Sequence, residues 1–461
     1  MSTQTLENFL HHDLNVLSVL DVVVSTDTRH LKTGDIFVAL NGPNFTGDNF
    51  ISIAAERGAR AAIVHTINPD VSIPQLAVAD TLVALTELAK LKRQATSAKV
   101  IAITGSAGKT SVKGMLHAIC DAYVKSDGNN VAPSAVVSTQ GNLNNHIGVP
   151  LTILSITSET QILIVEAGTS GVGEIAHLTH IIQPHIAVIN NIAEAHVENF
   201  GSVDGIAKEK SALYTHSDLS CCCVINVDDY YANYFRQHID SRQVMSYSLT
   251  SNHQYADVAV ENIHVNTQGF PAFTLCVQDE KINIELNVVG EHNVSNALAA
   301  SSCALALNID VKSIALGLKQ YTGIAGRMNV HHLSNYVVVD DTYNANPKSM
   351  FAAIDYLSNQ PNSVLILGDM GELGEFASNA HTNVGVYALQ KNIQQLYCVG
   401  KYINDYVKGF GIGAHSFVSQ HDLLSFLNTQ QLSGTVILIK GSRSAKMENI
   451  VSFLIAAAEC Q

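Results

Sequence analysis

Hydrophobic residues fall into short runs separated by amphipathic stretches, most clearly from residue 99 onward. The runs KVIAIT, QILIVEAG, HIAVINN and CCCVINVDD are apolar at consecutive positions, which is typical of strands buried in a parallel sheet. Between residues 258 and 289 apolar and polar positions alternate instead, in VAVENIHV, AFTLCV and INIELNVV. This alternation predicts half-exposed antiparallel strands, and the helical pattern NVSNALAASSCALAL follows them.

The flanking segments have patterns of their own. In the N-terminal segment, strands are expected at residues 36–40, 61–65 and 75–78, and helices at residues 49–57 and 81–92. In the last third, the runs YVVVDD, SVLILGDM, QLYCVG, AHSFVS and TVILIKGS alternate with helical stretches. That rhythm predicts a doubly wound α/β domain, but no GxGxxG follows its first strand, so a dinucleotide site is not indicated.

The predicted fold class is therefore α/β with three domains, in keeping with a chain of 461 residues. Residues 1–82 would form a small α/β domain. Residues 83–315 would form a central domain with a mostly parallel sheet and a small antiparallel part. Residues 316–461 would form a Rossmann-like domain.

Composition removes several classes of function. No run of 18 apolar residues occurs, so we expect no transmembrane helix, and the first residues do not resemble a signal peptide. The net charge of −14 argues against a nucleic-acid partner. Eight cysteines without a CxxC pair favour a reduced, cytoplasmic protein over a disulfide framework.

The stretch VIAITGSAGKTSVKGML combines an apolar run, a glycine turn and a helical pattern. A strand that ends in glycines and feeds a helix presents backbone N–H groups to phosphates. Lys109 can then reach the β- and γ-phosphates, and the Thr110 hydroxyl can ligate Mg²⁺. Ile103 stands where the general P-loop has its first glycine, so the motif is the tighter Gly105-x-x-Gly108. The alternative is a plain glycine turn with a solvated lysine, and the motif does not say which reaction uses the nucleotide.

Polar residues at other predicted strand ends could handle metal or charge. Glu166 ends QILIVEAG, His196 follows HIAVINN, and Asp340 and Asp341 end YVVVDD. Ligands of parallel α/β sheets bind at this edge, so these groups could contact magnesium or phosphate. Equally, they could be an ordinary strand-end acid, a structural histidine and a capping acid.

Amide-rich and basic segments complete the set of candidates. The loop TQGNLNNHIGVP, residues 139–150, carries more side-chain amides than a plain turn needs and suits a polar ligand. His292 and Asn296 lie on one face at the start of a helical pattern. Arg327 could face the γ-phosphate or could be a surface charge. From the residues alone, Lys208 and Lys210 are predicted to lie on a solvent-exposed face of a helix.

Taken in order, these motifs resemble the Mur ligases of peptidoglycan synthesis over essentially the whole chain. The segments that carry the resemblance are STDTRHLKTGDIFVALNG, TGSAGKTS, TQGNLNNHIGVP, EAGTSGVGEI, NNIAEAHVENFGS, AKEKSALY, GEHNVSNALAA, GRM, DDTYNANP, LGDMGELG and KGSRSAKME. Within the family, DDTYNANPKSM and LGDMGELGEF resemble the members that add D-alanyl-D-alanine. The members that add diaminopimelate carry Asp-Asn-Pro-Arg, which is absent here. One departure is TSGVGEI, where the family commonly has a proline-glycine pair before Glu-Ile.

The resemblance implies a role for each candidate. Glu166, His196, Thr110 and a carbamylated Lys210 would hold Mg²⁺, with two ions expected, while Lys208 is the less favoured lysine. ATP would contact Gly105, Ser106, Ala107, Gly108, Lys109, Thr110, Ser111, His292, Asn293, Asn296, Arg327 and Asp341. The UDP-linked substrate would contact Thr28, Arg29, Thr139, Asn142, Asn144 and Asn145, and the incoming dipeptide Asn344 and Asn346.

The implied reaction is ATP-driven addition of D-alanyl-D-alanine to UDP-N-acetylmuramoyl-tripeptide through an acyl phosphate, by a monomer. Lys109, Lys210, His196 and Glu166 would be the catalytic residues. Two other enzymes stay open: the sister ligase that adds diaminopimelate or lysine, and folylpolyglutamate synthetase. A different class also stays open, a P-loop regulator that binds ATP and a partner protein without ligating anything.

Overall fold

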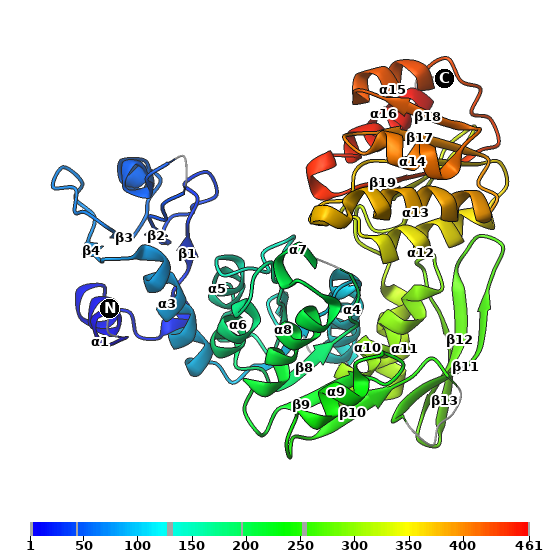
Figure 1. The fold of residues 1–461 in the computed structure, drawn as a ribbon. Helices are drawn as coiled ribbons and strands as arrows, with labels where there is room; N and C mark the ends of the chain where they lie inside the picture. Colours follow the sequence, from blue (N-terminus) through cyan, green and yellow to red (C-terminus); the bar gives the residue numbers. More distant parts are fainter. Residues whose placement is uncertain (1–2, 43–44, 127–131, 195–196, 251–255, 460–461) are drawn as a thin grey trace.

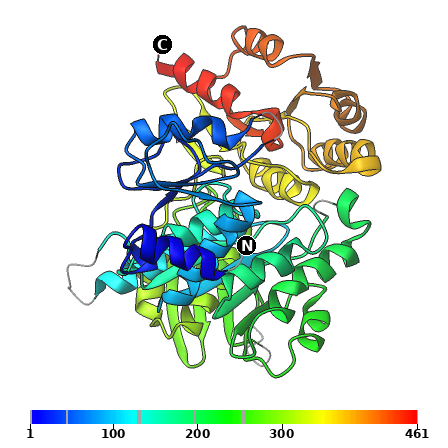
Figure 2. The ribbon, with the colours of Figure 1, turned by 90° about the vertical axis from the view of Figure 1, so that its left-hand side faces the viewer.

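The computed structural model describes residues 3–42, 45–126, 132–194, 197–250 and 256–459. It contains three sheets of four, nine and six strands, which organise an N-terminal, a central and a C-terminal unit. The central unit lies between the other two (Figure 1). Seen from the N-terminal side, the C-terminal unit lies above both of them (Figure 2). The predicted α/β class is confirmed.

The central sheet has the strand order β13-β12-β11-β10-β9-β8-β5-β7-β6. Its parallel strands are β5 (Lys99–Thr104), β6 (Val136–Ser138), β7 (Ile162–Glu166), β8 (Ile186–Ile189), β9 (Cys222–Asn226) and β10 (Val244–Tyr247). Strand β11 (Val258–Val265) joins β10 in parallel, and β12 (Pro271–Val277) and β13 (Glu280–Glu285) continue the sheet antiparallel. The predicted mixture of parallel and antiparallel strands is confirmed.

Helices bury both faces of the parallel part of this sheet, which explains why β5, β7 and β8 are apolar at consecutive positions. Val100 and Ala102 of β5 face α5 (Gly148–Leu154), α6 (Glu174–Ile182) and α8 (Val203–Thr215). Ile101 and Ile103 face α4 (Lys109–Ser126), α10 (His292–Ala306) and α11 (Val311–Gln320). The shorter helices α7 (Val197–Phe200) and α9 (Ala232–Gln237) lie in connections between strands.

The N-terminal sheet is parallel, with the order β1-β2-β3-β4. Its strands are β1 (Val24–Ser25), β2 (Ile36–Val38), β3 (Ala61–Val64) and β4 (Gln75–Ala77), so the three predicted strands are confirmed. The predicted helix at 49–57 is a 3₁₀ turn (Gly47–Phe50) followed by α2 (Ile51–Glu56). Helix α1 (Thr3–Asn8) precedes the sheet.

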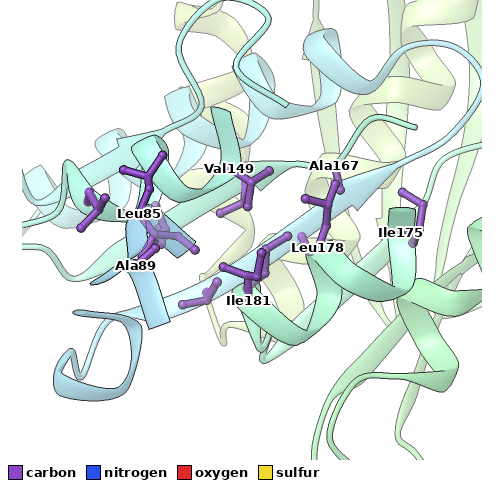
Figure 3. Close-up of a cluster of buried hydrophobic side chains, with 14 of the residues drawn as sticks. Leu85, Ala89, Val149, Ala167, Ile175, Leu178 and Ile181 are labelled. Atoms are coloured by element: carbon purple, nitrogen blue, oxygen red, sulfur yellow. The ribbon is translucent and has the colours of Figure 1, made fainter. Parts of the chain in front are cut away.

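Helix α3 (Thr81–Ala95) joins the N-terminal and central units. Leu85 and Ala89 of α3 pack with Val149 of α5 and with Leu178 and Ile181 of α6 in one apolar cluster (Figure 3). That cluster continues into the N-terminal sheet through the buried side chains of β2 and β3. The two units therefore share one core.

Two buried cations of α3 reinforce this junction. The Lys92 ammonium donates to the Val22 carbonyl at 2.6 Å and to the Leu154 carbonyl at 2.9 Å, one in each unit. The Arg93 guanidinium donates to the carbonyls of Ile182 and Gln183 at 2.8 and 2.6 Å. Burial lowers the pKa of Lys92 from 10.5 to about 8.

We expect Lys92 to make stability depend on pH. Between pH 8 and pH 10.5 the unfolded lysine keeps a proton that the folded one releases, so the free energy of unfolding rises with pH. Relative to a Lys92→Met variant, the wild type should gain up to about 3 kcal/mol across this range. Urea unfolding at pH 7.5, 8.5 and 9.5 measures the difference. Parallel curves for the two proteins would contradict the assignment.

The C-terminal sheet has the order β14-β15-β19-β16-β17-β18. The five predicted strands are confirmed as β15 (Val337–Asp341), β16 (Ser363–Leu367), β17 (Gln395–Val399), β18 (Ala414–Phe417) and β19 (Val436–Lys440), all parallel. The edge strand β14 (Asn329–His332) is antiparallel and was not predicted. Helices α12 (Pro347–Ser358), α13 (Ala377–Gln390), α14 (Ile403–Phe410), α15 (Gln420–Leu427) and α16 (Glu448–Glu459) accompany this sheet.

The predicted domain limits stay predictions, although residue 82 falls within α3 and residue 315 within α11. In the described ranges, no helix is both long and apolar enough to cross a bilayer. The seven cysteines described are free and buried.

Candidate active site

The glycine turn between β5 and α4 adopts a backbone that glycine permits. Gly105 and Gly108 have φ angles of +147° and +77°. A Cβ on Gly108 would lie 2.3 Å from Asn296 Oδ1 and 2.6 Å from Asn190 Nδ2, so a side chain there would displace both amides. The turn is therefore closely packed as well as left-handed, and α4 begins at Lys109.

Two asparagines that follow β8 hold this turn in place, and sequence reasoning did not single them out. Asn191 Oδ1 accepts from the Ala107 N–H at 2.9 Å, and Asn190 Nδ2 donates to the Ala107 carbonyl at 2.9 Å. Asn190 also donates to Asn296 Oδ1 at 3.0 Å, and Asn296 donates to Asn293 Oδ1 at 2.9 Å. This amide chain links the turn to the start of α10.

Glu166 lies at the carboxyl end of β7 and is 2% exposed. Its Oε1 accepts from Asn144 Nδ2 at 2.9 Å, whereas its Oε2 is buried without a hydrogen-bond partner in the part of the chain described. Thr139 supports this strand end, because its hydroxyl accepts the Glu166 N–H and its carbonyl accepts from Lys113. A buried, unsatisfied carboxylate oxygen is a suitable ligand for a hard cation.

Two lysines bring positive charge to the same region. The Lys109 ammonium donates to the Gly105 carbonyl at 2.8 Å, and burial lowers its pKa. Lys210 on α8 is 2% exposed, and burial, followed by the charge of Lys109, lowers its pKa from 10.5 to about 7. Lys208 is exposed on the same helix. His196 lies outside the described residues.

Arg327 reaches the turn from the segment that leads into the C-terminal unit. Its Nη2 donates to Thr110 Oγ1 at 3.4 Å, and its guanidinium stacks 4.2 Å from the centre of the Tyr343 ring. Arg327 Nε is buried and lacks an acceptor among the described residues. The cation is thus held beside the turn by an aromatic face and keeps a donor for a further group.

Both carboxylate oxygens of Asp341 accept hydrogen bonds within the protein, whereas Glu166 keeps one oxygen without a partner among the described residues. Asp341 accepts from the buried Lys440 ammonium at 2.6 Å and from the Met328 N–H at 3.3 Å. Lys440 also donates to the Asn344 carbonyl at 2.9 Å. The side chain of Asn346 caps α12 by accepting from the Ser349 N–H.

Two cavities open at the turn, each of 490 Å³. The first runs from Gly108 to His292, Asn293 and Asn296 on α10 and reaches Arg327 and Asp341. The second joins Lys109 and Thr110 to C-terminal loops, with Asn344, Asn346, Glu194, Glu372 and Arg443 in its lining. The structure therefore gathers most of the predicted ATP-binding residues around the glycine turn.

Of the residues predicted for the UDP-linked substrate, Thr139 and Asn144 contact Glu166 and the others lie farther along their segments. Arg29 is exposed on the N-terminal unit and pairs with Asp27 at 2.7 Å, and the Thr28 carbonyl accepts from Arg57. Asn142 is exposed, and Asn145 accepts the N–H groups of Ile147 and Gly148 at the start of α5. In the part of the chain that is described, no group of three or more His, Cys, Asp and Glu residues could hold a metal.

Comparison with known proteins matches both the central and the C-terminal units. A Mur ligase middle domain matches residues 103–304, and a Mur ligase glutamate ligase domain matches residues 326–443. The UDP-N-acetylmuramoyl-tripeptide–D-alanyl-D-alanine ligase of Escherichia coli is 37% identical over 460 residues, which cover 99% of this chain and 98% of that protein.

Solved structures agree along the whole chain. MurF from Acinetobacter baumannii is 36% identical with a TM-score of 0.84, over 94% of this chain and 93% of that one. Thermotoga maritima MurF in complex with ADP is 25% identical with a TM-score of 0.80, over 96% and 99%. A diaminopimelate ligase, at 18% identity and a TM-score of 0.53, shares the fold alone. The chain therefore belongs to the Mur ligase family and, within it, to the ligases named for adding D-alanyl-D-alanine, as its motifs indicated.

Proposed function

We propose that the chain joins UDP-N-acetylmuramoyl-tripeptide to D-alanyl-D-alanine with hydrolysis of ATP to ADP and phosphate. The observation that carries this proposal is the full-length similarity to ligases of that name, at 37% identity over 99% of the chain. The product would be the UDP-linked pentapeptide precursor of peptidoglycan. The protein would act in the cytoplasm as a monomer.

The arrangement of cations at the glycine turn supports this chemistry. In the first step, a carboxylate oxygen of the tripeptide attacks the γ-phosphorus, the bond to the bridging oxygen breaks, and ADP leaves. Both reactants are anionic, so positive charge must screen them as they approach. Lys109, which lies against the Gly105 carbonyl, and Arg327, which donates to Thr110, supply that charge from two different units. ATP would occupy the cavity that leads to His292, Asn293 and Asn296.

In the second step, the amine of D-alanyl-D-alanine attacks the acyl carbon. The tetrahedral intermediate expels phosphate as its C–O bond breaks, and the amine loses a proton. Residues 316–461 would bring the dipeptide to the acyl phosphate, with Asn344 and Asn346 at the edge of the second cavity. Because the Asn346 side chain caps α12, its contact with the dipeptide would use the remaining donors of the amide. Closure of the units would keep water from the acyl phosphate.

The buried carboxylate at the end of β7 and the polar groups beside it fit a magnesium site. Mg²⁺, when bound, would neutralise charge on the phosphates. Glu166 would use its unsatisfied Oε2, together with Thr110, His196 and Lys210. Addition of CO₂ to the Lys210 amine, with loss of a proton, would give a carbamate, which replaces repulsion between Lys210 and Lys109 by attraction. We expect two ions, as the family resemblance implies.

The UDP-linked substrate would bind between the units. Residues 1–82 would hold the nucleotide through Thr28 and Arg29, and Asn142, Asn144 and Asn145 would face the sugar-peptide part. Thr139, whose hydroxyl and carbonyl are already engaged, would act by holding Glu166 and Lys113.

Phosphate release tests the proposal. The protein with ATP, Mg²⁺ and UDP-N-acetylmuramoyl-tripeptide should release phosphate when D-alanyl-D-alanine is added and not when diaminopimelate, lysine or glutamate is added. Release with a single amino acid would favour the sister ligase or folylpolyglutamate synthetase. ATP binding without release under any condition would favour a P-loop regulator.

A further inference from the structure

The loop between Glu166 and α6 contains no proline to restrict its backbone. It reads Ala167-Gly168-Thr169-Ser170-Gly171-Val172-Gly173, with glycine at three of seven positions and with Val172 80% exposed. Such a segment loses much backbone entropy when it is ordered. Gly173 stands at the N-cap of α6 with a φ angle of +87° and offers no side chain to cap the helix.

A carboxylate from another helix supplies the missing cap. Glu209 on α8 is 6% exposed, its Oε2 accepts the Gly173 N–H at 2.7 Å, and its Oε1 accepts the Ile175 N–H at 2.8 Å. Both bonds are short and charge-assisted, and they place a negative charge at the positive end of the α6 dipole. Glu209 therefore fastens the loop to α8 by its two carboxylate oxygens.

The fastened loop is one wall of a cavity of 320 Å³. Gly168, Gly173 and Glu174 line it from one side, and Asn145 and His146 line it from the amide-rich loop. The two walls are tied together, because the Gly168 N–H donates to the Asn144 carbonyl at 2.8 Å and Asn144 in turn donates to Glu166. A shift of the α6 start would therefore change the shape of this cavity.

We propose that Glu209 is a positioning residue for the UDP-linked substrate: it fixes Gly173 and the start of α6, and so the cavity wall opposite Asn145. This inference rests on the proposed function, in which Asn145 faces that substrate. Successive residues of a helix point about 100° apart, so Glu209 serves the loop while its neighbour Lys210 serves the glycine turn. One turn of α8 thus supports both the substrate wall and the catalytic lysine.

Steady-state kinetics of a Glu209→Ala variant test the proposal. KM for UDP-N-acetylmuramoyl-tripeptide should rise about tenfold, because the free energy lost with the cap of α6 is expected to weaken binding of that substrate. KM for ATP should stay within about twofold of the wild-type value. Asp310→Ala is the matched control, because Asp310 caps α11 through the Ser313 N–H at 2.9 Å and lies outside the cavity lining. The control should lose stability without a change in KM. Equal rises in KM for the two variants, or none for Glu209→Ala, would overturn the proposal.

A second substitution tests whether order in the loop is what Glu209 provides. Val172→Pro should restore KM in the Glu209→Ala background, since proline restricts the backbone and the structure records no acceptor for the Val172 N–H among the described residues. A folded double variant that keeps the raised KM would overturn this cause.

Hydrogen exchange separates this inference from the proposed function. If the wild type turns over no substrate, the proposed function fails, yet the amides of Gly173 and Ile175 can still be followed. Faster exchange of these two amides in Glu209→Ala than in Asp310→Ala supports the role of Glu209 in ordering the loop. Unchanged exchange overturns it.

Discussion

Replacement of Lys109 by alanine is expected to leave a folded protein that hydrolyses almost no ATP. The lysine lies against the Gly105 carbonyl and shares the phosphate end of the site with Arg327. Without it, the tripeptide carboxylate would approach the γ-phosphate with one fewer positive charge, which should lower kcat by roughly 10³-fold. Phosphate release under saturating substrates measures the loss.

Lys125→Ala is a suitable control for that experiment. Lys125 lies near the end of the same helix and makes an exposed ion pair with Asp121 at 2.6 Å. Surface pairs of this kind contribute little, so its activity should match that of the wild type. Thermal unfolding should show that Lys109→Ala stays folded, because Asn190 and Asn191 hold the turn from below. A near-normal rate for Lys109→Ala would remove the phosphate role of the turn.

A second large effect is expected for Lys210→Ala. If Lys210 carries a carbamate, the variant loses an anion inside a buried site, and its kcat should fall roughly 10²-fold or more. Added acetate supplies a small carboxylate in the vacated space and should restore part of the activity. The same salt should leave the wild type unchanged.

Lys208→Ala separates the two lysines of α8. Lys208 is exposed, whereas Lys210 is 2% exposed and close enough to Lys109 for that charge to lower its pKa. Lys208→Ala should therefore retain activity. A fully active Lys210→Ala would rule out the carbamate, and a loss that acetate does not relieve would point to packing rather than charge.

The buried strands could be predicted from the sequence because their apolar runs are set by local burial on two faces. Val100 and Ala102 meet one layer of helices and Ile101 and Ile103 the other, so β5 needs no alternation. Strands β1 and β6 were not expected, and the two residues of β1 are too few for any period to show. Strand β14 is an edge strand with three partly exposed positions, and only its pairing with β15 defines it.

The candidate site divides along a similar line. The glycine turn and Glu166 could be predicted because each directly follows an apolar run that forms a strand. Both lie at the strand ends where the sequence places them. Asn190, Asn191 and Lys440 act on residues about 80 to 110 positions away, and no spacing along the chain reports such contacts. Two asparagines directly after a buried strand were the available signal for the first pair.

Some residues of the family motifs have structural roles that the motifs do not indicate. Asp341 and Asn346 belong to a segment that the resemblance connects with ligands, yet one is paired with Lys440 and the other caps α12. A motif marks a position as chemically constrained without separating a ligand contact from a support for its neighbours. Where the chain departs from the family pattern before Glu174, the Glu209 carboxylate accepts the Gly173 and Ile175 N–H groups, a contact that the motif does not reveal.

The shared core at α3 bears on how such enzymes can be recombined. A chimera that takes its first domain from a relative and changes over at residue 82 would set a foreign segment against the buried Lys92 ammonium in place of Val22, whose carbonyl is one of its two acceptors. If the crossover were placed after residue 95, α3 would come from the relative together with the N-terminal sheet. Its side chains would then have to fit the surfaces of α5 and α6 of this chain. The junction at Arg327 is constrained as well, because that side chain connects Thr110 of the central unit with the Tyr343 ring.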